Sequence, residues 1–240
     1  MGEQLAIGDV QHIQDDLLAM AGIVEGMLLE SVDLLQRSDL AGLERLGEEE
    51  RQISAKRLAI EMGCLKIIAS QRPKGVALRS AVAMVEIASE LERIAYHAKQ
   101  VARANCLMLE HHLRKPLGSI HHLAAEVQVM LDRALEAFSQ QDVSAARRVC
   151  DDAQAADALY RQVYQELLVV MNSRPRAANQ AIYLSRAAYH LKRASDRVTG
   201  ICEWVVFIVL GTMDAMVKLP PDPWRRASAS DSIQTKSISL

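Results

Sequence analysis

The chain has 240 residues, of which half are hydrophobic and 24% are charged, and its formal net charge is −2 at pH 7. This composition is typical of a globular protein with one large domain or two smaller ones. The lack of a basic excess argues against a nucleic-acid partner, because phosphates would require a face rich in Lys and Arg. Only two Trp, five Tyr and two Phe are present, and this scarcity favours helices over strands.

The sequence also argues for a cytoplasmic location. The first ten residues contain no basic segment followed by an apolar run, so we expect no secretory signal. The longest apolar run lies between Glu203 and Asp214 and is too short to cross a bilayer, which requires about twenty residues. The cysteines form no C-x-x-C pair, as expected for reduced thiols in a cytosolic protein; they are Cys64, Cys106, Cys150 and Cys202.

Apolar residues recur with steps of three and four in six stretches, which is the pattern of helices packed side by side. The stretches cover residues 13–34, 46–67, 84–101, 123–137, 149–170 and 184–208. Ser38 and Asp142 are predicted N-caps, because their side-chain oxygens can accept the free N–H groups of a new helix. Pro73 and Pro175 fit the first turns of the third and sixth helices.

The segments "SELERIAYHAKQV" from residue 89 and "YHLKRASDRVTGI" from residue 189 repeat one outline after a hundred residues. This predicts an all-α fold of two tandem antiparallel three-helix bundles, together forming an elongated molecule. We place the bundles at residues 1–115 and 116–217. A Pro- and Ser-rich tail at 218–240 shows no periodicity and is predicted to be disordered.

The sequence contains no nucleotide-binding glycine loop and no turn that presents a nucleophile, so we expect no enzyme. The double histidines at 111–112 and 121–122 could bind a transition metal or could simply form a polar turn. His97 and His190 lie near the repeated segments, which leaves histidine phosphotransfer as a further hypothesis. Neither histidine is retained in the other copy, since His97 corresponds to Arg197 and His190 to Glu90.

Residues four apart share a helix face, so Glu92 projects with Tyr96 and Lys192 projects with Asp196. Two carboxylates at this spacing would suit a hard cation. Each copy has only one of them, and the Lys192–Asp196 combination is typical of a surface ion pair.

At these residues the sequence resembles the PhoU family, the cytoplasmic regulators of phosphate uptake. The stretches "LERIAYHAKQV" and "LKRASDRVTGICEWVVFIVLG" are similar to the hallmark segment that occurs once in each three-helix bundle of the family. The upstream run "QRPKGVALRSAVAMVEIASELERI" and the later stretch "DDAQAADALYRQVYQELL" extend the similarity over about residues 9–213.

Family members often contain Glu/Asp-x-x-x-Asp motifs that can hold metal clusters, and this chain departs from those motifs. The second helix has Glu50 but Ser54, and the fifth has Asp157 but Ala153. The remaining acids define the metal-site hypothesis, in which a divalent cation or iron would bind weakly if at all, and no cofactor is required. These candidate ligands are Glu50, Glu92, Asp157 and Asp196.

The resemblance implies a non-enzymatic adaptor that represses phosphate uptake when phosphate is plentiful. Its expected partners are the ATPase of the phosphate ABC transporter and the phosphate-sensing histidine kinase, so that it reaches the membrane only through them. A homodimer is also expected. Arg93 and Arg193, retained in both copies, are candidates for partner recognition or for ordinary ion pairs within the bundle.

Overall fold

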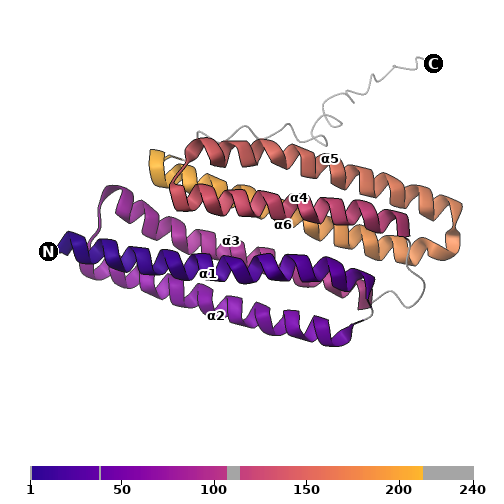
Figure 1. Ribbon diagram of the computed structural model, residues 1–240, viewed down its shortest axis with the longest axis horizontal. Helices are drawn as coiled ribbons and strands as arrows, with labels where there is room; N and C mark the ends of the chain where they lie inside the picture. The colour runs from indigo at the N-terminus through magenta and orange to yellow at the C-terminus, as the bar shows by residue number, and fades with distance from the viewer. Residues whose placement is uncertain (1, 38, 107–113, 213–240) are drawn as a thin grey trace, which may run out of the picture.

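The computed structural model describes residues 2–37, 39–106 and 114–212, and these form six long α-helices and one short 3-10 turn. The predicted all-α fold of two three-helix bundles is confirmed, and the molecule is elongated along the helices (Figure 1). The predicted tail at 218–240 lies outside the described residues. The helices and the 3-10 turn are α1 (Gly2–Gln36), α2 (Leu40–Gln71), α3 (Gly75–Cys106), α4 (Arg114–Gln140), α5 (Val143–Ser173), η1 (Pro175–Ala177) and α6 (Ala178–Leu210).

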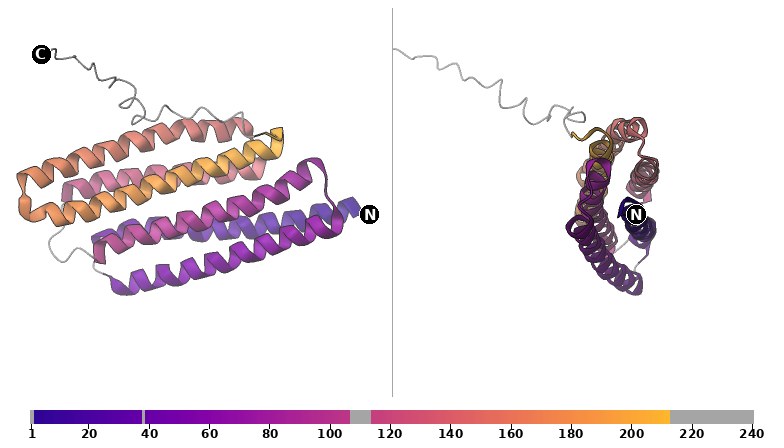
Figure 2. Two further views of the ribbon diagram at one scale, coloured as in Figure 1. Left: turned by 180° about the vertical axis from the view of Figure 1, so that it is seen from behind. Right: turned by 90° about the vertical axis from the view of Figure 1, so that its left-hand side faces the viewer.

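The two bundles lie side by side and share one core. Helices α5, α6, α3 and α2 form a curved layer in that order, and α4 and α1 cover its inner side (Figure 2). The strongest contact between the bundles is that of α3 with α6, and α1 also contacts α4. All the buried apolar side chains therefore belong to a single cluster that runs through both bundles.

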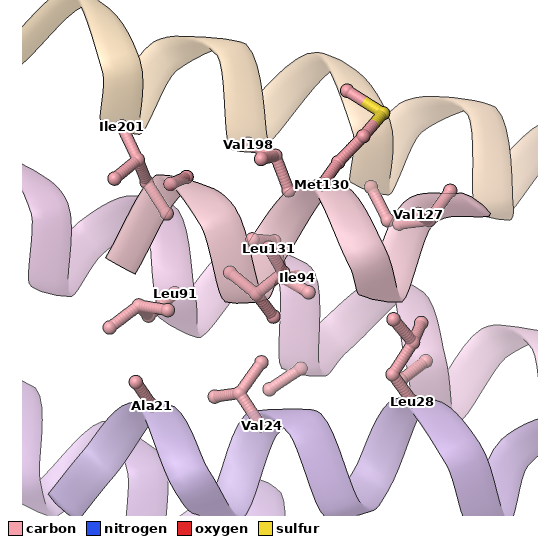
Figure 3. Close-up of a cluster of buried hydrophobic side chains, with 14 of the residues drawn as sticks. Ala21, Val24, Leu28, Leu91, Ile94, Val127, Met130, Leu131, Val198 and Ile201 are labelled. Carbon is pink, nitrogen blue, oxygen red and sulfur yellow. The ribbon is translucent and has the colours of Figure 1, made fainter. Parts of the chain in front are cut away.

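Apolar side chains from four helices meet where the two layers face each other, as Figure 3 shows. Every labelled residue there is buried, and all but Ala21, Leu28 and Leu131 belong to the predicted apolar stripes. Burying apolar area at about 25 cal/mol per Å² makes this cluster the main source of folding energy. Its labelled members are Ala21, Val24, Leu28, Leu91, Ile94, Val127, Met130, Leu131, Val198 and Ile201.

The helix ends follow local rules with two departures from the sequence prediction. Asp142 is confirmed as an N-cap, because its carboxylate accepts the N–H groups of Ser144 and Ala145. The cap of α2 is Asp39 rather than Ser38, which lies outside the described residues; the Asp39 carboxylate accepts the N–H of Gly42 at 2.9 Å. Because α2 begins at Leu40, Asp39 is the residue directly before the helix, and its side chain reaches the free N–H groups.

The two prolines predicted to lie in first helical turns, Pro73 and Pro175, occupy different kinds of position. Pro73 lies in the link before α3, which begins at Gly75, so the prediction that it opens this helix is wrong. Pro175 opens the 3-10 turn that leads directly into α6, a position where its missing N–H costs nothing. No helix within the described ranges is both long enough and apolar enough to cross a membrane.

The end of α6 is tied to the other bundle. Gly211 adopts φ +76, and its N–H returns to the carbonyl of Phe207. From α3, the Arg79 guanidinium donates to the carbonyls of Ile208 at 2.7 Å and Val209 at 3.3 Å. A cation at a helix C-terminus stabilises the exposed carbonyls and the helix dipole, so α3 helps to end α6.

Replacing the cap Asp142 tests the local control of α5. The Asp142→Ala variant should lower the free energy of unfolding by about 1 kcal/mol, because two N–H groups lose their acceptor. Urea unfolding followed by circular dichroism measures the loss. Asp142→Asn is the matched control, since its amide oxygen still accepts; an equal loss in both variants would contradict the capping role.

Candidate functional site: charged contacts between the helices

The repeated segments of α3 and α6 lie against each other in antiparallel register. His97 faces His190, Glu90 faces Arg197 and Arg79 reaches the end of α6. Because the repeat relates position 97 to 197 and position 90 to 190, these two contacts occupy equivalent places on either side of the centre of the helix pair, two helical turns apart. One is a histidine pair and the other an ion pair, so the duplication has become chemically asymmetric.

The histidine pair is half-buried and surrounded by aromatic rings. The Nδ1 atoms of His97 and His190 lie 3.1 Å apart, so one ring donates and the other accepts. Tyr96 packs edge-on at 5.4 Å from His97 and 6.4 Å from His190, and Tyr189 packs edge-on at 5.5 Å from His190, between ring centroids. The sequence placed these histidines near the repeats but gave no sign that they touch.

The surroundings of this pair favour neutral imidazoles. Burial lowers the pKa of His97 to about 4, and the neighbouring His190, Arg197 and Arg193 act in the same direction. The pKa of His190 is also lowered, by burial and by Arg186. This half-buried, arginine-flanked arrangement differs from the exposed histidine beside acidic groups that the phosphotransfer hypothesis requires.

Two turns before His97 on α3, Glu90 lies between two arginines. Its carboxylate is 3.5 Å from the Arg197 guanidinium and 3.4 Å from that of Arg93. Burial raises the pKa of Glu90, while the positive charges of Arg197 and Arg93 oppose this shift. Burial and the charge of Glu90 also raise the pKa of Glu203. The carboxylates of Glu86, Glu90 and Glu203 therefore lie close to one another in this part of the α3–α6 contact.

In the first bundle, both predicted metal ligands are bound by cations of this chain. The Arg57 guanidinium on α2 contacts Glu92 on α3 at 2.9 Å and Glu61 on its own helix at 2.8 Å. The ammonium of Lys99 on α3 pairs with Glu50 on α2. These ion pairs join α2 to α3, and they satisfy the negative charges that a metal would otherwise neutralise.

The second bundle has a related contact with the charges exchanged. Here the cation is on the third helix, and the Lys192 ammonium lies 2.6 Å from Asp157 on α5 and 2.5 Å from Asp196 on α6. Arg193 adds a contact to Asp196 at 3.1 Å. Burial lowers the pKa of Lys192, but its bonds to Asp157 and Asp196 outweigh this and leave the pKa raised.

The four candidate carboxylates do not fit a metal cluster. Glu92 pairs with Arg57, Glu50 pairs with Lys99, and Asp157 and Asp196 share Lys192. The described part of the chain contains no group of three His, Cys, Asp or Glu side chains placed to hold a metal. His111 and His112 lie outside the described residues, and His121 and His122 line a small hollow between α1 and α4. Sequence reasoning missed Arg57 and Lys99, because no local spacing links them to Glu92 and Glu50.

The two candidate recognition arginines lie on α3 and α6. Arg93 is 54% exposed and Arg193 is 37% exposed, as measured on the side chains. Each contacts one carboxylate of its own helix, Glu90 or Asp196. Their exposure agrees with the recognition hypothesis, and their carboxylate contacts agree with the ion-pair alternative.

The comparison with known proteins agrees with this duplicated architecture. The sequence model of the PhoU domain matches residues 17–104 and 120–205, one match in each bundle. The chain belongs to the PhoU family.

Curated PhoU relatives match most of the chain. The phosphate-specific transport system accessory protein PhoU homolog of Pseudomonas aeruginosa is 29% identical, with 85% of each chain covered. PhoU of Escherichia coli is 25% identical over 85% of this chain and 84% of its own. The crystal structure of PhoU from Pseudomonas aeruginosa superposes with a TM-score of 0.80 at 29% identity, covering 85% of this chain and 99% of that one. The phosphate transport system regulatory protein PhoU from Streptococcus pneumoniae shares the fold, with a TM-score of 0.80 at 21% identity, over 87% of this chain and 98% of its own.

Removing the Lys192 ammonium tests whether it takes the place of a bound cation. The Lys192→Gln variant leaves Asp157 and Asp196 without their shared partner, so it should bind Mn²⁺ at least about tenfold more tightly than the unchanged chain. Calorimetric titration measures both affinities. The control adds Asp157→Asn and Asp196→Asn and should lose the gain; equal affinity in all three proteins would show that Lys192 does not control cation binding.

The histidine pair should make stability depend on pH. In the folded chain the pKa of each histidine is lowered below its unfolded value near 6.5. The contribution of the pair to folding stability is therefore complete above pH 6.5. It is lost as the pH falls from about 6.5 towards 4. The melting temperature of His97→Gln/His190→Gln should fall less over this range than that of the unchanged chain, by about 2–4 °C. His12→Gln alters an exposed histidine as control, and parallel pH profiles for all three would refute the assignment.

Proposed function

We propose that this chain is a cytoplasmic adaptor that represses phosphate uptake and phosphate signalling when phosphate is plentiful. The observation that supports this most strongly is the PhoU-domain match in both bundles. The accessory-protein relatives, which align over 85% of the chain, support it further. The proposed partners are the ATPase of the phosphate ABC transporter and the phosphate-sensing histidine kinase.

The architecture suits a protein that works by docking. Long helices present extended faces to helical partners, while the apolar stripes are used within the core. Two concave regions on the described part of the chain are a hollow of about 300 Å³ between α1 and α4 and one of about 490 Å³ between α4 and α5, and both are open to solvent. We propose a non-enzymatic role that requires no metal, since Arg57, Lys99 and Lys192 already neutralise the candidate ligands. A homodimer is the proposed assembly.

Deleting the gene in its native host tests the proposal. Without the adaptor, a phosphate-starvation reporter should be expressed in phosphate-rich medium, and a plasmid copy of the chain should restore repression. The tagged chain should also retain the transporter ATPase and the kinase during purification. Normal repression in the deletion strain would refute the regulatory role, whereas restored repression without either partner retained would refute the proposed contacts.

A further inference from the structure

The outer surface of α3 and α6 faces away from α1 and α4 (Figure 2, left). One end of this surface has a distinctive set of side chains. There Tyr96 is 46% exposed and Tyr189 is 48% exposed, on either side of the half-buried contact between the two histidines. Arg103 follows Tyr96 by two turns on α3, and Arg186 precedes Tyr189 by one turn on α6; both are exposed. We call these four residues the basic–aromatic end.

The two arginines of the basic–aromatic end have no ion-pair partner among the residues that the structure describes. Residues 93–106 and 174–195 contain no Asp or Glu at all. Three other arginines of α3 and α6, namely Arg93, Arg193 and Arg197, each contact a carboxylate. Arg103 and Arg186, in contrast, form no ion pair with any residue that the structure describes. Two guanidinium groups are thus available beside two exposed phenol rings.

The duplication shows that this charge is local to one end. The positions equivalent to Arg186 and Arg103 in the other copy are Glu86 and Glu203, a hundred residues away in each case. Both glutamates are exposed, and they lie at the opposite end of the α3–α6 contact, near Glu90. The same surface therefore has a basic end with tyrosines and an acidic end without them.

These side chains are suited to binding a protein surface. Tyr and Arg are enriched at the energetic centres of interfaces, because Tyr buries a large rigid ring and Arg can grip a carboxylate with two parallel hydrogen bonds. Ile182, 49% exposed, lies one turn before Arg186 on the same face of α6 and extends the apolar area. An occupant must supply acids for the arginines and apolar side chains for Tyr96, Tyr189 and Ile182.

We propose that the basic–aromatic end docks an acidic amphipathic helix of a partner protein. Carboxylates of that helix pair with Arg103 and Arg186, and its apolar side chains cover Tyr96 and Tyr189. This inference rests on the proposed adaptor function and identifies the surface and the partner chemistry that the function uses. The charge complementarity favours an acidic segment over a basic or neutral one.

The first test measures binding of a labelled amphipathic peptide of Glu and Leu to the full chain by fluorescence anisotropy. Arg103→Glu/Arg186→Glu should weaken binding at least tenfold, and Tyr96→Ala/Tyr189→Ala should also weaken it. Arg147→Glu/Arg148→Glu is the matched control, because it reverses two exposed arginines of α5 that form no ion pair with a described residue. A Lys–Leu peptide should not bind. No binding of the acidic peptide, or an equal loss in the control, would overturn the proposal.

Two other occupants are distinguished by further measurements on the same proteins. A second copy of the chain could occupy the surface with its own acidic end. Sedimentation would then show a dimer that is lost in Arg103→Glu/Arg186→Glu. That result, together with no peptide binding, would overturn the acidic-helix proposal and make a second copy the occupant. Binding to phosphatidylglycerol vesicles but not to the peptide would make the surface a lipid site and overturn the proposal. Peptide affinity tests this surface even if the gene deletion does not alter phosphate regulation. Failure of the docking proposal can therefore be distinguished from failure of the proposed function.

Discussion

The antiparallel contact between α3 and α6 holds the two bundles together, and the rest of the structure depends on it. It is the most extensive contact between any two helices, and it places both repeated segments at the centre of the molecule. Small side chains let two helices approach closely, and alanines fill many buried positions on both. Examples are Ala83, Ala88, Ala95, Ala98, Ala187, Ala188 and Ala194.

An antiparallel contact between two copies of one segment imposes a symmetry that mutation can then break. A contact between the two copies then has an equivalent contact on the other side of the centre of the helix pair. A substitution in one copy changes one end alone. Thus Glu90 forms an ion pair with Arg197 whereas His97 contacts His190, although the positions of the two contacts are equivalent.

The charged contacts at the flanks have a different role from the core. Arg57 and Lys192 are half-buried cations, each placed between two carboxylates that join neighbouring helices. Partly exposed ion pairs contribute little net stability, typically 0–1 kcal/mol. Breaking one leaves a poorly solvated charge, which is costlier. These contacts therefore fix the register of α2 on α3 and of α5 on α6 more than they stabilise the fold.

The fold was predictable because helical periodicity, caps and the repeat are local signals, and Asp142 shows how directly a single side chain can mark a helix end. The errors at Ser38 and Pro73 concern one or two residues, a distance over which neighbouring capping groups compete. The candidate site was less predictable. Its acids were identified, but their partners Arg57 and Lys99 lie on another helix, and only tertiary packing brings them together.

The duplication also explains how one fold can present unlike surfaces. Two identical bundles would show a partner the same face twice, so an adaptor built from them could not tell one end from the other. In this chain the equivalent positions 86 and 186, and likewise 103 and 203, have opposite charges, while the apolar stripes of both copies remain. Because core residues determine the shape and exposed charges determine which partners are attracted, the surface could diverge without cost to the fold. The asymmetry between the ends is therefore the feature most directly available for distinguishing one partner from another.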